Sequence, residues 1–163
     1  MYIQLKTTYL CTVKIEDEVQ TKVFQNEFHK AQVNIIFSAW WLKNKMLPFL
    51  RKHGLSHEQF NVMRIIRGQK SNEVCVKDIT ARMLERSSNT TRIIDKLEVK
   101  GLVQRKQSPN DKRELHIVLT DSGSALLKKI DQEWITDDPV HIGLNAEEAG
   151  MLNNLLDKLR IQE

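Results

Sequence analysis

The chain has few of the residues that define several protein classes. Two cysteines in 163 residues, Cys11 and Cys75, are too few for a disulfide framework, and their spacing does not suit a metal-binding pair. The most apolar stretch, residues 33–41, is closed by Lys43 and Lys45, so no membrane span is expected. The first residues lack the continuous apolar run of a secretory signal. We therefore expect a cytoplasmic protein without membrane contact.

Recognisable enzyme chemistry is also missing. The five histidines are scattered, and neither a glycine-rich phosphate loop nor a nucleophile elbow is present. His53 and His57 are four residues apart, but Gly54 and Ser56 lie between them, so they do not share a helical face. The sequence thus predicts a protein that is not an enzyme and holds no metal and no cofactor.

The composition is that of an ordinary folded domain, with 40% hydrophobic and 28% charged residues, which excludes a disordered tail protein. The net charge of +4 is unevenly distributed. Residues 51–120 hold 15 basic and 8 acidic side chains, whereas the remaining chain holds 10 and 13. A basic middle segment suggests a polyanionic partner such as DNA, because clustered Lys and Arg release counterions from phosphate, but a solvated basic surface would give the same charge count.

Two patterns divide the first 54 residues. Apolar and polar residues alternate from Ile3 to Ile15, which predicts a strand-like extension over residues 1–15. From about Glu16 the period becomes helical, and one stripe comprises Phe24, Phe28, Ala31, Ile35, Ala39, Leu42 and Met46. The later half of this helix is apolar on most sides, so it needs burial on two faces, which suggests a second chain.

The basic middle segment predicts a helix-turn-helix. Ser56 and Gln59 form a capping box that opens a helix ending near Gly68. A short strand at Val74–Val76 and a helix over about residues 77–85 follow. We expect a second helix, capped by Ser87 or Ser88 and stopped by Gly101, to come directly after it.

The last third of the chain predicts a hairpin and two helices. Residues 102–107 and 114–119 are strand-like, with strong turn formers between them. Thr120 and Asn145 each cap a further helix, and the last helix carries a stripe of Leu152, Leu155, Leu156 and Leu159. The predicted fold is therefore mainly helical, a winged helix-turn-helix flanked by amino- and carboxy-terminal helices.

The sequence SSNTTRIIDKLE at residues 87–98, followed by Gly-Leu-Val at 101–103, resembles the recognition helix of the MarR family of transcriptional regulators. The wing SPNDKR at 108–113, then Leu-Thr at 119–120 and Gly123, matches the family's Asp-x-Arg wing and Leu-Thr-x-x-Gly segment. The resemblance implies a homodimeric regulator on a pseudo-palindromic double-stranded operator, commonly a repressor released by a ligand. It implies a dimerisation helix at 16–54, a winged helix at 55–120 and carboxy-terminal dimerisation helices at 121–163.

The resemblance also assigns residues to roles. Ile93 or Ile94 and Leu97 would face the core, so that Arg92 could bond a guanine edge and Asn89 an adenine edge. The expected DNA-binding residues are Ser87, Ser88, Asn89, Thr90, Thr91, Arg92, Lys96, Arg105, Lys106, Asp111, Lys112 and Arg113. The expected dimerisation residues are Phe24, Phe28, Ile35, Leu152, Leu155, Leu156 and Leu159.

Some alternatives stay open at this stage. A pocket for a small hydrophobic or phenolic effector would use Phe37, Trp40, Trp41, Met46 and Phe60, although such residues are also typical of a core. Cys11 or Cys75 could serve a thiol-based redox sensor. A winged-helix interaction module without operator binding is the remaining alternative, and the presence of Arg92, Asp111 and Arg113 argues against it.

Overall fold

Helices make up most of the computed structural model, which describes residues 13–21, 23–69, 73–85, 89–107 and 115–160. None of the helices in these ranges has the length and apolarity needed to cross a bilayer. The chain divides into two compact units. One is Ala39–Val140, and the other combines Met1–Ser38 with His141–Glu163.

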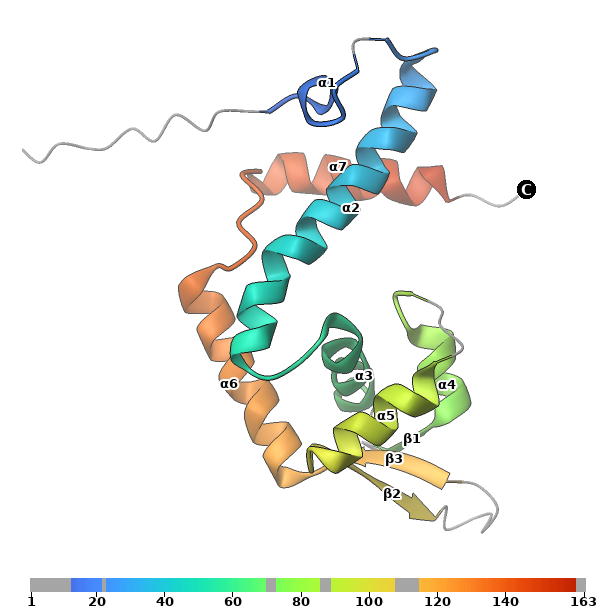
Figure 1. The fold of residues 1–163 in the computed structure, drawn as a ribbon, viewed down its shortest axis with the longest axis vertical. Coiled ribbons are helices and arrows are strands. Elements are labelled where there is room, and N and C mark those ends of the chain that lie inside the picture. Colours follow the sequence, from blue (N-terminus) through green and yellow to red (C-terminus); the bar gives the residue numbers. More distant parts are fainter. Residues whose placement is uncertain (1–12, 22, 70–72, 86–88, 108–114, 161–163) are drawn as a thin grey trace, which may run out of the picture. The chain divides into compact units, whose positions relative to one another are not determined.

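The Ala39–Val140 unit contains a helix-turn-helix and a small sheet (Figure 1). After the second half of α2 (Glu27–Lys52), the elements are α3 (His57–Arg67), β1 (Glu73–Cys75), α4 (Val76–Arg82), α5 (Thr90–Val99), β2 (Val103–Gln107), β3 (Leu115–Leu119) and α6 (Asp121–Asp137). The predicted class, a mainly helical chain with a small hairpin, is confirmed. The helices α4 and α5 are the two members of the helix-turn-helix.

The strands form one antiparallel sheet in the order β1-β3-β2. In the β2–β3 hairpin, Val103 pairs with Leu119 and Gln107 with Leu115. The short β1 adds a third strand, with Val74 opposite Ile117. Val74, Val103 and Ile117 are all buried, so one side of the sheet packs on the core while the hairpin extends away from it.

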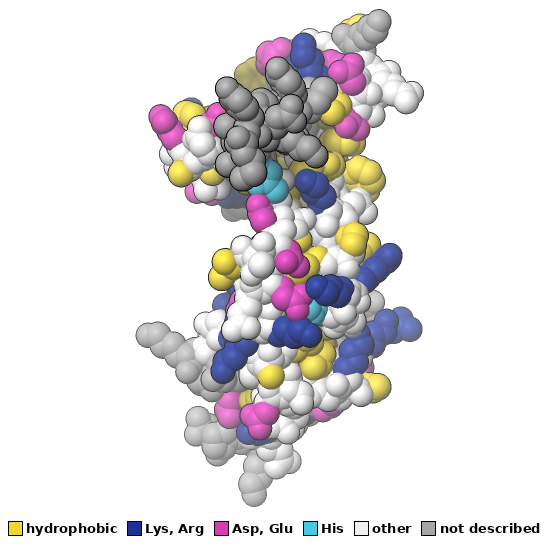
Figure 2. Space-filling view, turned by 90° about the vertical axis from the view of Figure 1, so that its left-hand side faces the viewer, with side chains coloured by type: hydrophobic (Ala, Val, Ile, Leu, Met, Phe, Trp, Pro, Cys, Tyr) yellow, Lys and Arg dark blue, Asp and Glu magenta, His cyan; other side chains and the backbone are white. Residues whose placement is uncertain are grey.

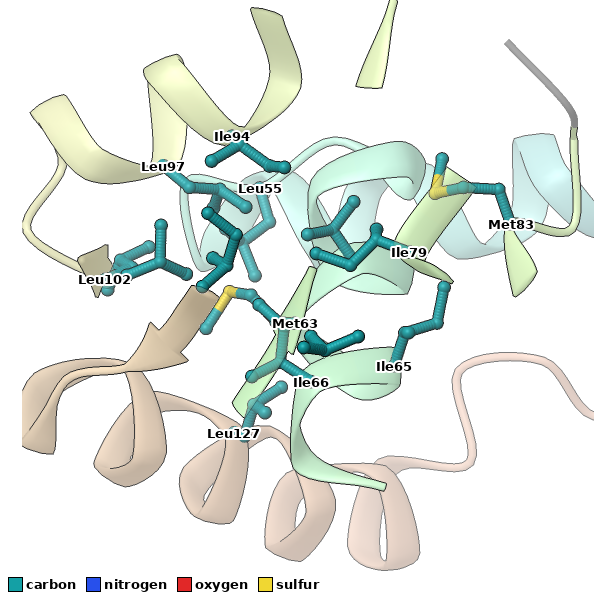
Figure 3. Packing of buried hydrophobic residues seen from close by; sticks show 14 of the residues in the cluster. Leu55, Met63, Ile65, Ile66, Ile79, Met83, Ile94, Leu97, Leu102 and Leu127 are labelled. Atoms are coloured by element: carbon teal, nitrogen blue, oxygen red, sulfur yellow. The ribbon is translucent and has the colours of Figure 1, made fainter. Parts of the chain in front are cut away.

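A single hydrophobic core joins the helices of this unit (Figure 3). Met63 and Ile66 of α3, Ile79 of α4 and Leu97 of α5 are completely buried in it. Met63 and Ile66 are three residues apart and therefore lie on the same face of α3. In all three helices, these buried residues are ones that the sequence periodicity predicted to face the core. Burial of this face fixes which side chains of α5 remain at the surface.

Helix termination follows local signals. The predicted capping box at Ser56 and Gln59 is confirmed, as is the left-handed glycine that ends α5, Gly101, with a φ of +68°. The Thr120 hydroxyl accepts from the Gly123 N–H at 3.0 Å and donates to the Gly101 carbonyl at 2.6 Å. One threonine therefore caps α6 and binds the turn that follows α5.

The other unit contains α1 (Ile15–Glu18), the first turns of α2 and α7 (Ala146–Leu159). Lys30 and Glu16 form an ion pair at 2.6 Å. The predicted capping box at Asn145 and Glu148 begins α7. None of the described residues of α7 is buried, and three leucines of its stripe, Leu152, Leu155 and Leu159, are exposed in this chain.

Three predicted boundaries are wrong. The stripe from Glu16 is not one helix: α1 ends at Glu18, Gln20 has a left-handed φ of 52°, and α2 begins at Glu27. The Asn26 carboxamide accepts from the His29 N–H at 2.9 Å, a local cap that competes with continuation from Glu16. The helix expected over 77–85 ends at Arg82, because Met83 is extended.

The third correction concerns the start of α5. Its N-cap is Asn89 and its first residue is Thr90, so the helix starts later than a cap at Ser87 or Ser88 would place it. Ser87 and Ser88 themselves lie outside the described residues. Of the predicted extension, residues 1–12 also lie outside them, and Ile15 belongs to α1 and not to a strand.

Gly123 provides a test of how closely α6 approaches the end of α5. A Cβ atom at this position would lie 2.1 Å from the Leu102 carbonyl oxygen. We expect Gly123→Ala to lower the free energy of unfolding by about 1–3 kcal/mol, since a backbone atom has to move. Urea unfolding measures this, with Ser122→Ala, exposed one residue earlier, as the control. Equal midpoints for the two variants would contradict the close approach.

Candidate nucleic-acid interface

The helix α5 has one buried and one exposed side. Ile94 and Leu97 are fully buried, which confirms the predicted core positions, and Ile93 is half-buried. Thr91, Arg92 and Lys96 are exposed. A donor-rich strip thus lies on the side of α5 away from the core, and a helix of this size fits the major groove of B-DNA.

Two adjacent threonines at the amino end of α5 differ in burial. Thr91 is exposed, but Thr90 retains only 2% of its accessible surface. The Thr90 side chain therefore belongs to the packing of the helix-turn-helix, and only its backbone remains suited to a phosphate at the helix end. Asn89 is exposed at the N-cap position. The hydrophobic periodicity of the sequence did not predict which of the two threonines is buried, because both are small and polar.

Arg105 is bound within the chain. Its guanidinium on β2 pairs with Asp95 at 2.5 Å and, more closely, with Glu98, and both carboxylates belong to α5. The hydrogen bond to Asp95, together with the charge of Glu98, raises the pKa of Arg105 above its usual value. Arg105, which the sequence suggested as a phosphate contact, thus fastens α5 to the first strand of the wing and offsets part of the negative charge of the helix.

The wing is described only at its base. Lys106 is exposed on β2, opposite His116 of β3. The predicted contacts Asp111, Lys112 and Arg113 lie outside the described residues.

Elsewhere, basic side chains lie next to acidic ones. Figure 2 shows Lys and Arg beside Asp and Glu over the lower half of the molecule, from the side on which α6 lies in Figure 1. Lys52 pairs with Glu133 of α6 at 2.8 Å, and Arg67 with Asp131 at 2.6 Å. The hydrogen bond from Lys52 lowers the pKa of Glu133. Such pairs make this region a weaker attractor of DNA than the exposed Arg92 and Lys96.

A hollow of about 270 Å³ lies between α2, α3 and the end of α4. Its lining includes Lys43, Met46, Phe60, Arg64, Met83 and Leu84. Met46 and Phe60 were predicted as pocket residues, whereas Trp40 is exposed and Trp41 stacks under the Lys45 ammonium at 4.6 Å. Phe37 belongs to the other unit. Only two of the five predicted residues are therefore brought together here.

The predicted dimerisation residues are largely exposed in this single chain. Phe28 has 82% of its surface exposed, Leu155 65% and Leu159 59%. Leu152 is also exposed, and Phe24, Ile35 and Leu156 are half-buried, with Phe24 in the link before α2. Apolar side chains in contiguous exposed stripes are typical of a protein interface.

A helix-turn-helix followed along the chain by an antiparallel hairpin is a winged-helix fold. The MarR family model matches residues 55–115. The HTH-type transcriptional regulator YkoM of Bacillus subtilis is 34% identical over 68% of this chain and 71% of its own length. The chain therefore belongs to the MarR family and is a MarR-type transcriptional regulator, not an enzyme.

Further similarities agree with this assignment. The transcriptional repressor MprA of Escherichia coli is 30% identical over 54% of this chain and 48% of its own length, so the match spans about half of MprA. A mutant MarR from Escherichia coli complexed with operator DNA has a TM-score of 0.73 at 24% identity. The match covers 85% of this chain and 99% of that one, and it supports the fold.

The contribution of the Arg105 ion pairs to folding can be measured as a change in the free energy of unfolding. We expect Arg105→Met to lower the free energy of unfolding by about 1 kcal/mol, because two carboxylates of α5 lose their partner. In a double-mutant cycle with Glu98→Gln, the two losses should not add. Lys106→Met, on the same strand and exposed, should change stability by less than about 0.5 kcal/mol. Strictly additive effects of Arg105→Met and Glu98→Gln would show that the ion pair has no energetic role.

Proposed function

We propose that this chain is a cytoplasmic homodimeric repressor that binds a pseudo-palindromic operator and is released by a small ligand. The observation that carries the proposal is the division of α5, in which Ile94 and Leu97 are buried while Arg92 and Lys96 are exposed. A recognition helix needs this arrangement, because its core contacts fix the orientation of the side chains that enter the major groove.

The proposed contacts fall into two groups. Arg92 and Asn89 supply paired donors and acceptors for base edges, with Thr91 and Lys96 beside them. Lys106 and the wing residues Lys112 and Arg113 supply cations for the phosphates and for a narrow minor groove, with Asp111 orienting Arg113 as the family motif implies. Ser87 and Ser88, which precede Asn89 in the sequence, remain proposed phosphate contacts. Arg105 we assign to positioning, because its charge is already compensated.

The exposed stripes support the homodimer. Residues 16–54 and 121–163 are proposed to form the dimerisation region, and residues 55–120 the winged helix. The α7 leucines have the spacing of a helix that packs on another helix, yet Leu155 and Leu159 are mostly exposed in one chain. A second copy would cover them and would present a second α5 to the other half of a palindrome.

The hollow beside Phe60 supports an effector site. Apolar walls from Met46, Phe60 and Met83 suit a small hydrophobic or phenolic molecule. The Lys43–Glu85 ion pair, at 2.5 Å, links α2 to the segment that leads into α5, and both residues line the hollow. A ligand there would act by binding one spacing of the recognition helices better than another.

The two alternative hypotheses have less support. Cys75 is half-buried next to the start of α4, which does not favour a thiol sensor at that residue, and Cys11 lies outside the described residues. A winged-helix protein-interaction module that does not bind an operator would not need Arg92 and Lys96 to be exposed on α5. The experiment below separates this module from an operator-binding protein.

The function is tested by selecting duplexes from a random library with the purified protein and measuring fluorescence anisotropy on the selected and shuffled DNA across a salt series. We expect a preference of about a thousandfold and a steep loss of affinity with salt. Arg92→Ala should cost about 1–3 kcal/mol and relax base preference at one position. Lys128→Met, which removes an exposed charge from α6, should leave base preference unchanged. Equal binding to selected and shuffled duplexes would refute sequence-specific recognition.

The dimer is tested by Leu155→Glu. We expect wild type to have twice the chain mass of 19.0 kDa in light scattering and the variant to dissociate, since a carboxylate cannot be buried unpaired in an apolar interface. Asn154→Glu, one residue earlier and away from the leucine stripe, should stay dimeric. A dimeric Leu155→Glu variant with unchanged dissociation constant would place the interface elsewhere.

A further inference from the structure

Both α2 and α5 end in the same backbone motif. After α2, the Gly54 N–H donates to the Arg51 carbonyl at 2.9 Å and the Leu55 N–H to the Leu50 carbonyl at 3.0 Å. Gly54 is left-handed, with a φ of +69°. These two bonds define a Schellman termination, in which the chain reverses and a hydrophobic residue anchors the turn. Leu55 is that anchor, with 3% of its surface exposed.

The end of α5 repeats this geometry. The Gly101 N–H donates to the Glu98 carbonyl at 2.8 Å, and the Leu102 N–H donates to the Leu97 carbonyl at 3.0 Å. Leu102 is buried like Leu55. The turns after the recognition helix and after α2 are therefore both rigid, and a contact between them can hold one helix end against the other.

Lys100 makes that contact. Its ammonium donates to the Gly54 carbonyl at 2.6 Å and to the Gln59 side-chain oxygen at 2.9 Å. Gln59 is buried, with 6% exposure, and its oxygen also accepts from the Ser56 N–H at 3.2 Å. Lys100 thus joins α5, the turn after α2 and the capping box of α3. Hydrogen bonds from a charged donor are stronger than neutral ones, and this donor has two of them.

The same end of α5 is also bound to α6, since the Gly101 carbonyl accepts from the Thr120 hydroxyl at 2.6 Å. The turn after α5 is held from two sides, by Lys100 toward α2 and by Thr120 toward α6. The family resemblance assigns both of these helices to dimerisation. The orientation of α5 is consequently coupled to the helices that would set the distance between two copies.

We infer that Lys100 is a positioning residue that sets the tilt of the recognition helix relative to α2 and thereby the half-site spacing that the dimer accepts. The inference rests on the proposed operator binding. A helix of ten residues is about 15 Å long, so a shift of ~1 Å at one end tilts it by about 4°. Two recognition helices must meet half-sites about one helical turn apart, so a loose tilt weakens the preference for one spacing.

The test compares Lys100→Met with wild type on the selected operator and on operators with one base pair inserted or deleted between the half-sites. We expect Lys100→Met to bind the selected operator about tenfold more weakly, from the loss of charge-assisted hydrogen bonds. Its salt dependence should match that of wild type, because no phosphate contact is lost. Its discrimination against the altered spacings should fall.

Two controls accompany the test. Lys128→Met makes the same substitution at an exposed site on α6, removing one positive charge there, and should keep wild-type affinity and spacing preference. Lys100→Arg keeps a cation that can donate to the Gly54 carbonyl and should recover most of the spacing preference. Thermal unfolding of every variant corrects each affinity for the folded fraction, so a merely structural role would leave no residual effect.

Two results would overturn the inference about Lys100 while leaving the proposed operator binding intact. If the salt slope of Lys100→Met falls by about one while the spacing preference stays, Lys100 is a phosphate contact. If the corrected affinity and the spacing preference both equal those of wild type, Lys100 does not position α5. If wild type itself selects no duplex, the proposed operator binding fails first, and the inference fails with it.

Discussion

The burial of one face of α5 is the constraint on which the rest of the structure depends. Ile94 and Leu97 are completely enclosed by the core that α3, α4 and the sheet provide. Because the side chains of a helix are fixed relative to one another, enclosing these two positions determines that Arg92 and Lys96 face outward. The hydrophobic effect, which is not directional, thereby orients the polar groups proposed to bind DNA.

Charge is arranged around this helix so that the outward face stays attractive to phosphate. Asp95 and Glu98 would repel DNA more strongly if they were unpaired, and Arg105 pairs with both, offsets one of their two negative charges and fastens α5 to the wing. Next to α6, by contrast, Lys52 of α2 and Arg67 of α3 are paired with the α6 carboxylates Glu133 and Asp131. Counting charges does not distinguish a DNA-binding surface from a solvated basic surface. Knowing which cations are paired with carboxylates favours the face of α5, where Arg92 and Lys96 are exposed.

How much the sequence predicts depends on the range of the interactions. The capping boxes at Ser56 and Asn145, the cap at Thr120 and the stop at Gly101 were predicted correctly, because each signal lies within a few residues. The buried face of α5 was also predicted, since it follows from a period of 3.6 residues.

Interactions between distant residues were not predictable. Neighbouring positions gave no sign that Thr90 is buried, that Arg105 binds two acids of α5, or that Lys100 reaches a carbonyl 46 residues earlier. A lysine before a helix-ending glycine is ordinarily assigned to the helix dipole. The break before α2 was missed for another reason: Asn26 is a cap, but the apolar stripe on both sides of it suggested one continuous helix.

The central claim, that the exposed face of α5 lies in the major groove of an operator, is tested most directly by photocrosslinking. Replacing thymines of a selected duplex by 5-iodouracil places the reactive iodine in the major groove, where the methyl group of thymine lies. The account predicts that mass spectrometry will find the crosslinked DNA on peptides that contain residues 89–96. Crosslinks confined to other segments, with none on α5, would contradict it.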